Sequence, residues 1–277
     1  MQLEDFLTPE FRTFLRDRMD AFAATAQARF GDAVIPIYGA KETGAPNHIG
    51  SAILLNVNSR KVLLTAAHVL DEHKFTTLYA PGVGKPIPIE GKFVATRAPE
   101  GNRDLDRFDF AYCRLSDEMS EAIVGRFVGE DEIVTSEVEE AGRLYTALGY
   151  PNSKNSRHNP ITQSIRPNLL PYSNVHKVDQ SVAATLPDGG RRHIFLPYGK
   201  RSRIDGLIVN SVAPRGMSGG AVVDAGRPGD LQTLLSGAAP IPRLAGLVIE
   251  RPGKRVLIAT RMSTIMPFLL APFPAAS

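Results

Sequence analysis

The sequence predicts a mostly β protein that carries one helix near each end. Its 277 residues include 24 glycines and 21 prolines, which indicates many turns and therefore many short strands. From residue 33 onward, short apolar runs alternate with clusters of turn-forming residues. The hydrophobic content of 43% and the charged content of 22% are ordinary for a globular protein. This length suffices for one large domain or two small ones.

A helix is predicted at the N-terminal end. Thr8 is a suitable N-cap, and Pro9 then occupies the first helical position. Gly31 provides a suitable end. Apolar residues recur between them at helical spacing, namely Phe11, Phe14, Leu15, Met19, Phe22 and Ala26. We expect this amphipathic helix to pack on the main body, and a role in partner binding is the alternative.

The first half of the chain then predicts a series of strands. Residues 56–60 form a turn-rich connection typical of a hairpin between two of these strands. The predicted strands are residues 33–38, 50–55, 61–65, 75–79, 87–89, 92–95 and 108–115. Strands at this spacing are typical of an all-β barrel or sandwich.

Charge is distributed unevenly, although the net charge is only +3. Residues 116–142 contain nine acidic residues and one basic residue, and we expect them to form a connector with a short helix from Ser116 through Phe127. Residues 151–206 contain nine basic and three acidic residues. We interpret both as solvated surface stretches that attract each other. The alternative is a basic binding face, but few aromatic residues are interleaved there, so a nucleic-acid partner is not expected.

The second half predicts another set of strands and a final helix. The helix covers residues 263–270. The predicted strands are residues 144–149, 163–166, 180–185, 193–196, 206–212, 218–223, 244–250 and 255–260.

The cysteine content and the N-terminus favour a reducing, cytoplasmic setting. Cys113 is the single cysteine, so no intrachain disulfide is possible, and its place within a strand pattern favours buried packing over a nucleophilic role. Residues 1–6 lack the basic and apolar regions of a signal peptide. No apolar run approaches the length of a membrane span, so we expect no membrane partner.

One glycine-rich motif admits two interpretations. Gly216-Met217-Ser218-Gly219-Gly220 lies between two apolar runs. Glycines permit backbone angles that other residues resist, so the motif suits an ordinary turn. It equally suits an exposed nucleophilic hydroxyl beside backbone N–H groups that form an oxyanion hole. A base and an orienting acid elsewhere in the chain would favour the second interpretation.

Both groups are present in suitable places. His68 ends an apolar strand, and Asp109 begins another. Taken singly, His68 fits a core histidine, and Asp109 and Ser218 fit turn residues. Together, the order His, Asp, Ser favours nucleophilic catalysis, because a serine hydroxyl needs a base and the base needs an orienting carboxylate.

This order resembles the trypsin/chymotrypsin-like serine protease superfamily, in particular intracellular, bacterial-type members. The similar motifs are Thr65-Ala66-Ala67-His68, Asp109-Phe110-Ala111 and Gly216-Met217-Ser218-Gly219-Gly220, and residues 244–248 and 259–261 look like the last strands of that family. The resemblance extends from residue 33 to the C-terminus.

The resemblance implies two six-stranded antiparallel β-barrels with the active site between them. We expect an N-terminal helical segment (1–32), a first barrel (33–115), an acidic connector (116–142) and a second barrel with the C-terminal helix (143–277). It implies a serine endopeptidase that hydrolyses proteins or peptides through an acyl-enzyme. His68, Asp109 and Ser218 would form the triad, and the N–H groups of Gly216 and Ser218 the oxyanion hole. No cofactor or metal is implied.

The sequence departs from secreted members of that family at Met217. Those members carry an aspartate there, which pairs with an N-terminus released by activation cleavage. Neither that aspartate nor an activation sequence before the first strand is present, so we expect no such switch.

The resemblance also places a substrate pocket. Val212 would form its base, and its other residues would be Arg215, Ile249, Glu250 and Arg251. No acid stands at the base, which argues against cleavage after Arg or Lys. We expect a small or medium apolar P1 residue.

Other chemistries fit less well. The motif also satisfies G-x-S-x-G, but an α/β-hydrolase needs a histidine after the serine, and no histidine follows Ser218. His68 and His73 lie five residues apart, which is unsuitable for a zinc site. No phosphate-binding fingerprint is present. The remaining alternative is a protease-fold binding or regulatory protein that stays latent until a partner or ligand engages residues 151–206 or the N-terminal helix.

Overall fold

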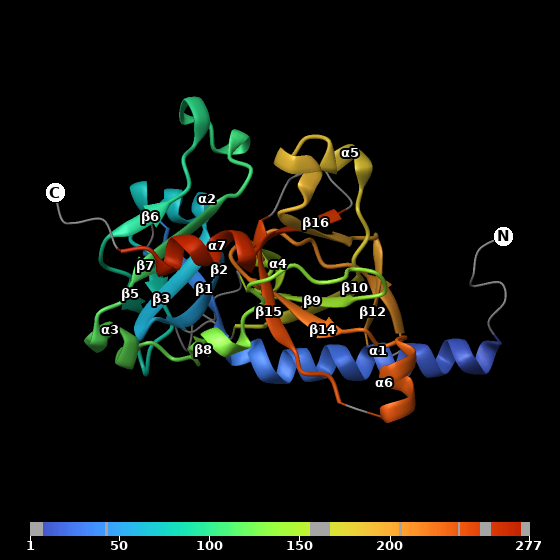
Figure 1. Ribbon diagram of the computed structural model, residues 1–277. Coiled ribbons are helices and arrows are strands. Elements are labelled where there is room, and N and C mark those ends of the chain that lie inside the picture. The colour runs from blue at the N-terminus through green and yellow to red at the C-terminus, as the bar shows by residue number, and fades with distance from the viewer. Residues whose placement is uncertain are drawn as a thin grey trace.

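Two curled antiparallel sheets form most of the molecule (Figure 1). The structure is a computed structural model, and it describes residues 8–41, 44–155, 167–204, 207–237, 239–249 and 256–272. The strand order of the first sheet is β5-β4-β1-β2-β3-β7-β6, and β8 also pairs with β2. The second sheet has the order β10-β9-β14-β15-β16-β11, and β12 and β13 form a separate two-stranded ribbon.

The first sheet contains a tight hairpin at its centre. Asn58 and Ser59 have φ angles of 50° and 56°, the left-handed conformation that a two-residue hairpin turn requires. This confirms the hairpin predicted for residues 56–60. The strands of this sheet are β1 (Val34–Ala40), β2 (Pro46–Val57), β3 (Arg60–Ala66), β4 (Tyr79–Ala80), β5 (Ile87–Pro88), β6 (Phe93–Ala95), β7 (Phe110–Arg114) and β8 (Val128–Gly129).

The second sheet is entirely antiparallel. Its strands are β9 (Leu144–Gly149), β10 (Leu170–Val175), β11 (His193–Pro197), β14 (Ala221–Gly226), β15 (Arg243–Ile249) and β16 (Val256–Arg261). The ribbon consists of β12 (Arg201–Ile204) and β13 (Leu207–Asn210). The α-helices are α1 (Pro9–Phe30), α2 (Ala67–Asp71), α3 (Asp117–Ala122), α4 (Asn152–Asn155), α5 (Gln180–Ala183), α6 (Leu231–Ser236) and α7 (Met262–Leu270). The 3-10 turns are η2 (Gly31–Ala33), η3 (Glu72–Lys74), η4 (Pro99–Gly101), η5 (Arg103–Leu105), η6 (Glu130–Glu132) and η7 (Pro187–Gly190).

The predicted fold class is confirmed, with a difference in strand number. Two antiparallel sheets with a helix at each end are present, and the second sheet has six strands, the predicted number. The first sheet has eight. The additional pairing comes from the acidic segment 116–142, because β8 lies parallel to β2. That segment therefore contributes to the first sheet and is more than a connector.

Several predicted elements differ in type or extent. The strand predicted for residues 180–185 is wrong: residues 180–183 form helix α5 and a turn follows, because the Asp179 side chain caps the helix by accepting from the N–H groups of Ser181 and Val182. Residues 75–79 form a strand only at Tyr79. Ser116 caps α3 as predicted, but the helix ends at Ala122 rather than at Phe127.

The sequence also left some strands unpredicted. β10 contains a proline and polar residues, and β12 contains two arginines, so neither has the apolar pattern of a buried strand. The strand predicted for residues 163–166 lies outside the described residues.

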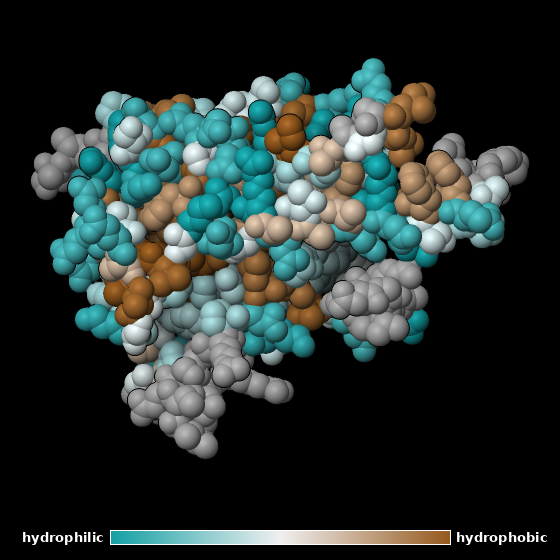
Figure 2. All heavy atoms as spheres, turned by 90° about the horizontal axis from the view of Figure 1, so that it is seen from below, coloured by the Kyte–Doolittle hydropathy of each residue, from teal (hydrophilic) through white to brown (hydrophobic). Residues whose placement is uncertain are grey.

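Helix α1 lies along the second sheet, with its N-terminal half beside α6 (Figure 1). Its C-terminal half buries Phe22, Ala26 and Phe30 in the core. By contrast, Phe11 and Phe14 stay 40% and 48% exposed, so the first two residues of the predicted apolar stripe do not pack on the body. Apolar atoms therefore gather at the end of the face where α6 and the start of α1 lie (Figure 2). Among the residues that the structure describes, no helix has the length and apolarity needed to cross a membrane.

Helix α7 connects the two sheets. It follows β16 of the second sheet and returns to the first, where the Tyr112 hydroxyl donates to the Phe268 carbonyl over 3.1 Å. The rings of Phe110 and Phe268 meet edge to face, with centroids 5.3 Å apart. One hydrophobic core cluster includes residues of α1, α7 and both sheets. Helix α7 and the shared core therefore fix the position of the two sheets relative to each other.

We predict that Phe30→Ala lowers the free energy of unfolding by about 3–5 kcal/mol, because its ring is fully buried at the end of α1. Phe14→Ala removes the same ring from the same helix and serves as the control, with an expected change below about 0.5 kcal/mol. Urea denaturation followed by circular dichroism measures both. Equal losses would contradict the packing described for α1.

Candidate active site

The sheet register brings His68 and Asp109 together. His68 is the second residue of α2, which directly follows β3, and Asp109 directly precedes β7. β3 and β7 pair antiparallel, with Ala66 opposite Phe110, so the end of one strand meets the start of the other. The two side chains thus come from adjacent strand ends, as the sequence predicted.

The Asp109 carboxylate holds His68 at two points. Asp109 Oδ2 lies 2.6 Å from His68 Nδ1, and Oδ1 accepts the backbone N–H of His68 over 3.0 Å. A carboxylate accepts hydrogen bonds, so in neutral His68 the proton resides on Nδ1 and the lone pair on Nε2. That tautomer is the one a general base needs.

Asp109 itself is fixed in an uncommon backbone conformation. Its φ angle is 45°, in the left-handed region that few non-glycine residues adopt. Asp106 stabilises this turn, because its Oδ1 accepts the N–H groups of Phe108 and Asp109 over 3.1 and 3.0 Å. Its Oδ2 accepts from Arg103 over 2.7 Å and also from Thr96. No role was predicted for Asp106 from the sequence, although an aspartate three residues before another can bond its backbone in this way.

Ser218 lies on the turn before β14, covered by β2 of the other sheet. Its carbonyl accepts the N–H of Ser51 over 2.8 Å. Gly50 lies between Ser218 and α2, since a Cβ added there would meet the Val69 side chain at 2.6 Å and the Ser218 carbonyl at 3.2 Å. The expectation of an exposed hydroxyl is therefore wrong: Ser218 is 2% exposed, and its Oγ makes no hydrogen bond to any residue that the structure describes.

Two backbone hydrogen bonds fix the orientation of peptide units in the glycine-rich loop, residues 215–219. The Arg215 carbonyl accepts the N–H of Asn152 over 2.7 Å, and the Met217 carbonyl accepts from Gly220 over 2.8 Å. In a planar trans peptide, the N–H of the next residue points opposite to the carbonyl. These two bonds therefore set the directions of the Gly216 and Ser218 N–H groups.

The Gly216 and Ser218 N–H groups have no acceptor within the described part of the chain. The Gly216 carbonyl, in contrast, accepts from Ser51 Oγ over 3.0 Å. This bond fixes the orientation of the peptide unit that follows Gly216. Two oriented N–H donors on adjacent turns are suited to bind a developing oxyanion. The loop thus carries two N–H groups and one hydroxyl, Ser218 Oγ, that make no hydrogen bond to any described residue.

Met217 occupies an apolar position. It is fully buried, belongs to the core cluster of the second sheet and lies against Gly149. A methionine there offers no carboxylate to an N-terminal amine.

The predicted pocket residues are only partly brought together. Val212 is half-buried, and its carbonyl accepts the hydroxyl of Tyr198. Arg215 is exposed and belongs to the glycine-rich loop. Ile249 is 1% exposed and packs in the core cluster beneath α5, so its side chain is a core residue. Glu250 and Arg251 lie outside the described residues.

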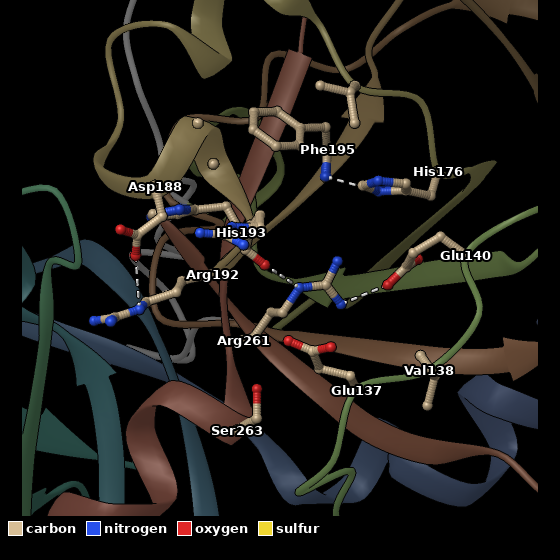
Figure 3. Close-up of a pocket in the computed structure, with 14 residues that line it drawn as sticks. Glu137, Val138, Glu140, His176, Asp188, Arg192, His193, Phe195, Arg261 and Ser263 are labelled. Atoms are coloured by element: carbon tan, nitrogen blue, oxygen red, sulfur yellow. Dashed lines mark hydrogen bonds and ion pairs between the residues drawn. The ribbon is translucent and has the colours of Figure 1, made fainter.

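A separate cavity of about 520 Å³ lies in the second half of the chain, where segment 137–140, η7, β11 and the end of β16 meet (Figure 3). Of the predicted pocket residues that the structure describes, Val212, Arg215 and Ile249, none lines it. Its charges are largely paired, since Arg261 bonds Glu140 and Arg192 bonds Asp188 over 2.7 and 2.9 Å. It therefore has no strong preference for a charged ligand.

Cys113 is a buried residue of β7 and lies apart from the His68–Asp109 pair. Burial raises the pKa of the Cys113 thiol to about 11, so the thiol is protonated at neutral pH. Within the ranges that the structure covers, no group of three His, Cys, Asp or Glu side chains is placed to hold a metal ion.

We predict that Gly216→Ala is far more damaging than Gly142→Ala. Both glycines have positive φ, 95° and 68°, which costs an alanine about 1–2 kcal/mol. A Cβ on Gly216 would also lie 2.0 Å from Asn152 Oδ1, whereas nothing lies within 4 Å of one on Gly142. Urea denaturation should show at least twice the loss of stability for Gly216→Ala. Equal losses would mean that Asn152 moves aside freely.

We also predict that Cys113 is inert in the native protein at pH 8. A thiol with a pKa near 11 carries almost no thiolate there, and the side chain is fully buried. Iodoacetamide should modify it only after denaturation, as intact-mass spectrometry would show. Rapid modification of the folded protein would contradict the packing of β7.

No protein-family model matches the sequence, and no curated protein matches it. Among solved structures, the Rv3671c protease in an inactive form aligns at 13% identity and a TM-score of 0.44, covering 88% of this chain and 90% of that chain. A scabies mite inactivated protease paralogue, S-I1, aligns at 11% identity and a TM-score of 0.47, covering 87% and 93%. The HtrA-type protease AlgW, with a tripeptide, aligns at 17% identity and a TM-score of 0.44, covering 90% and 63%.

Likenesses this distant are similarities of fold and carry no activity with them. The architecture is informative in its own right, because two curled antiparallel sheets face each other and the last helix returns from the second sheet to the first. This is the arrangement of two antiparallel sheets with a helix near each end that the sequence predicted.

Proposed function

We propose that this protein is a serine endopeptidase in which Ser218 is the nucleophile, His68 the general base and Asp109 the residue that orients His68. One observation supports this most directly. The paired His68 and Asp109 lie at strand ends of the first sheet. Gly50 lies between the helix that carries His68 and a loop whose Gly216 and Ser218 N–H groups have no acceptor among the described residues. A core histidine or an ordinary turn has no need of both features.

The proposed reaction proceeds through an acyl-enzyme. Ser218 Oγ attacks the scissile carbonyl carbon as His68 Nε2 takes its proton, and the carbonyl electron pair moves onto oxygen. The C–N bond then breaks, and His68 gives the proton to the leaving amine. Water, deprotonated by His68, attacks the acyl carbon and releases the carboxylic acid and free Ser218. Asp109 stabilises the imidazolium that forms twice in this cycle.

The N–H groups of Gly216 and Ser218 would bind the tetrahedral oxyanion. A single donor of this kind typically stabilises the transition state by about 3 kcal/mol. The substrate would be a protein or peptide that runs past Val212 and Arg215, with a small or medium apolar P1 side chain. A cytoplasmic setting suits an enzyme whose single, buried cysteine forms no disulfide.

A second candidate is a latent or purely binding role. It is favoured by the buried Ser218 Oγ, which makes no hydrogen bond among the described residues. The exposed apolar side chains of α1 and α6 would then be the contact surface for a regulatory protein. Active-site hydrogen bonds often tighten only when substrate binds, so the enzymatic proposal remains the better supported one.

We predict that a fluorophosphonate probe labels the wild-type protein and Ser263→Ala but not Ser218→Ala. Ser218→Ala should change the free energy of unfolding by less than about 0.5 kcal/mol, because an unbonded hydroxyl leaves no partner unsatisfied when it is removed. Asp109→Asn should lower kcat by about 10⁴-fold. Intact-mass spectrometry, thermal denaturation and peptide hydrolysis measure the three effects.

Two outcomes would count against this proposal. Labelling of Ser218→Ala at the wild-type rate would place the reactive group elsewhere. Absence of labelling in the wild type, with and without added binding partners, would favour a binding protein.

A further inference from the structure

A buried histidine outside the triad contacts the residue behind the oxyanion loop. His48 lies on β2, is 2% exposed, and its Nδ1 lies 2.6 Å from Asn152 Oδ1. The ring of Tyr38 meets it edge to face at 5.4 Å. Burial lowers the pKa of His48, so the neutral ring is the relevant form. An amide oxygen only accepts, so His48 Nδ1 carries the proton and donates it to Asn152.

Asn152 in turn contacts the glycine-rich loop in two ways. Its backbone N–H donates to the Arg215 carbonyl over 2.7 Å. Its side chain covers Gly216, since a Cβ built on that glycine would lie 2.0 Å from Asn152 Oδ1 and 2.9 Å from Asn152 N. The Arg215 carbonyl and the Gly216 N–H belong to one planar peptide unit. Any rotation of that unit therefore has to displace Asn152.

We propose that His48 and Asn152 are positioning residues for the oxyanion hole. The His48 Nδ1–H bond holds the Asn152 side chain against Gly216, and Asn152 thereby keeps the 215–216 peptide turned so that the Gly216 N–H points toward the oxyanion. This inference rests on the proposed peptidase function, but the geometry of the loop tests it independently of turnover.

The same strand contacts the chain on both sides of Gly216. β2 supplies His48, which holds the Asn152 side chain against Gly216, and also Ser51, whose Oγ donates to the Gly216 carbonyl in the next peptide unit. Ser51 Oγ accepts the Tyr150 N–H over 3.0 Å, so its own direction is fixed. Strand β2 of the first sheet thus orients a loop that belongs to the second sheet. It does so through two residues, His48 and Ser51.

Two substitutions distinguish whether His48 acts through its hydrogen bond to Asn152 or only by filling space. In His48→Asn the side-chain amide nitrogen falls near the position of Nδ1 and can still donate to Asn152. In His48→Gln the amide nitrogen falls near the position of Nε2 and cannot. Both replacements are neutral and polar, so burial costs are matched. Asn152→Ala removes the acceptor and the cover over Gly216 but keeps the backbone N–H.

We expect His48→Gln and Asn152→Ala to lower kcat by about 10- to 100-fold with KM within about two-fold, below the cost of deleting an oxyanion donor. His48→Asn should retain most of the wild-type kcat. The double variant His48→Gln/Asn152→Ala should be little worse than Asn152→Ala, because the two residues act through one contact. Hydrogen exchange of residues 211–221, measured by mass spectrometry, should accelerate in His48→Gln and Asn152→Ala but not in His48→Asn.

The outcomes distinguish this inference from the proposed function. If the wild type hydrolyses peptides and His48→Gln matches it in both kcat and exchange, the positioning role is wrong and the peptidase stands. If His48→Asn and His48→Gln are equally impaired, His48 only fills space, and the inference is also wrong. If the wild type is neither labelled nor active, the peptidase proposal fails, and the exchange pattern alone decides whether His48 and Asn152 position the loop.

Discussion

The contact between β2 and the glycine-rich loop is the interaction on which the candidate site depends. Ser51 donates its N–H to the Ser218 carbonyl and its hydroxyl to the Gly216 carbonyl. Ser51 is itself fixed, because its carbonyl accepts the Thr65 hydroxyl over 2.7 Å. The three residues of the candidate triad come from two sheets. The position of Ser218 relative to His68 and Asp109 therefore depends on this contact. α7, α1 and the shared core keep the sheets in the relation that the contact requires.

Close approach and turn conformation together explain the glycines of the motif, since Gly216 and Gly219 have φ angles of 95° and 83°. A Cβ on Gly219 would lie 1.9 Å from the Ser51 carbonyl, and one on Gly220 would lie 2.3 Å from the Leu148 carbonyl. Strands of both sheets therefore reach the loop at distances that only glycine allows. The same close packing buries Ser218, whose hydroxyl has no hydrogen bond to a described residue. This buried hydroxyl is compatible with both the peptidase and the latent-protein proposals, and the labelling experiment distinguishes them.

Local sequence chemistry predicted much of the frame. Thr8 and Ser116 cap helices as expected, and the turn at Asn58 and Ser59 joins the predicted hairpin, because these signals act over a few residues. Residues 180–185 were predicted wrongly because a short apolar run fits a strand or a helix equally well, and the Asp179 cap decides the matter. The first two residues of the apolar stripe on α1, Phe11 and Phe14, face solvent, since periodicity shows which residues share a face but not how far the body extends beneath them.

The sequence by itself determined the residue types of the candidate triad, their order and their places at strand ends. It also determined that Met217 offers no carboxylate to a new N-terminus. Tertiary structure alone decided the roles of Asp106, Ser51, Asn152 and His48, because these residues act through hydrogen bonds to chain segments that are distant in sequence or folded back on themselves. It also decided that Ser218 is buried. No local pattern records which strand of another sheet will cover a turn, so the covering of Ser218 by β2 follows only from the packing of the two sheets.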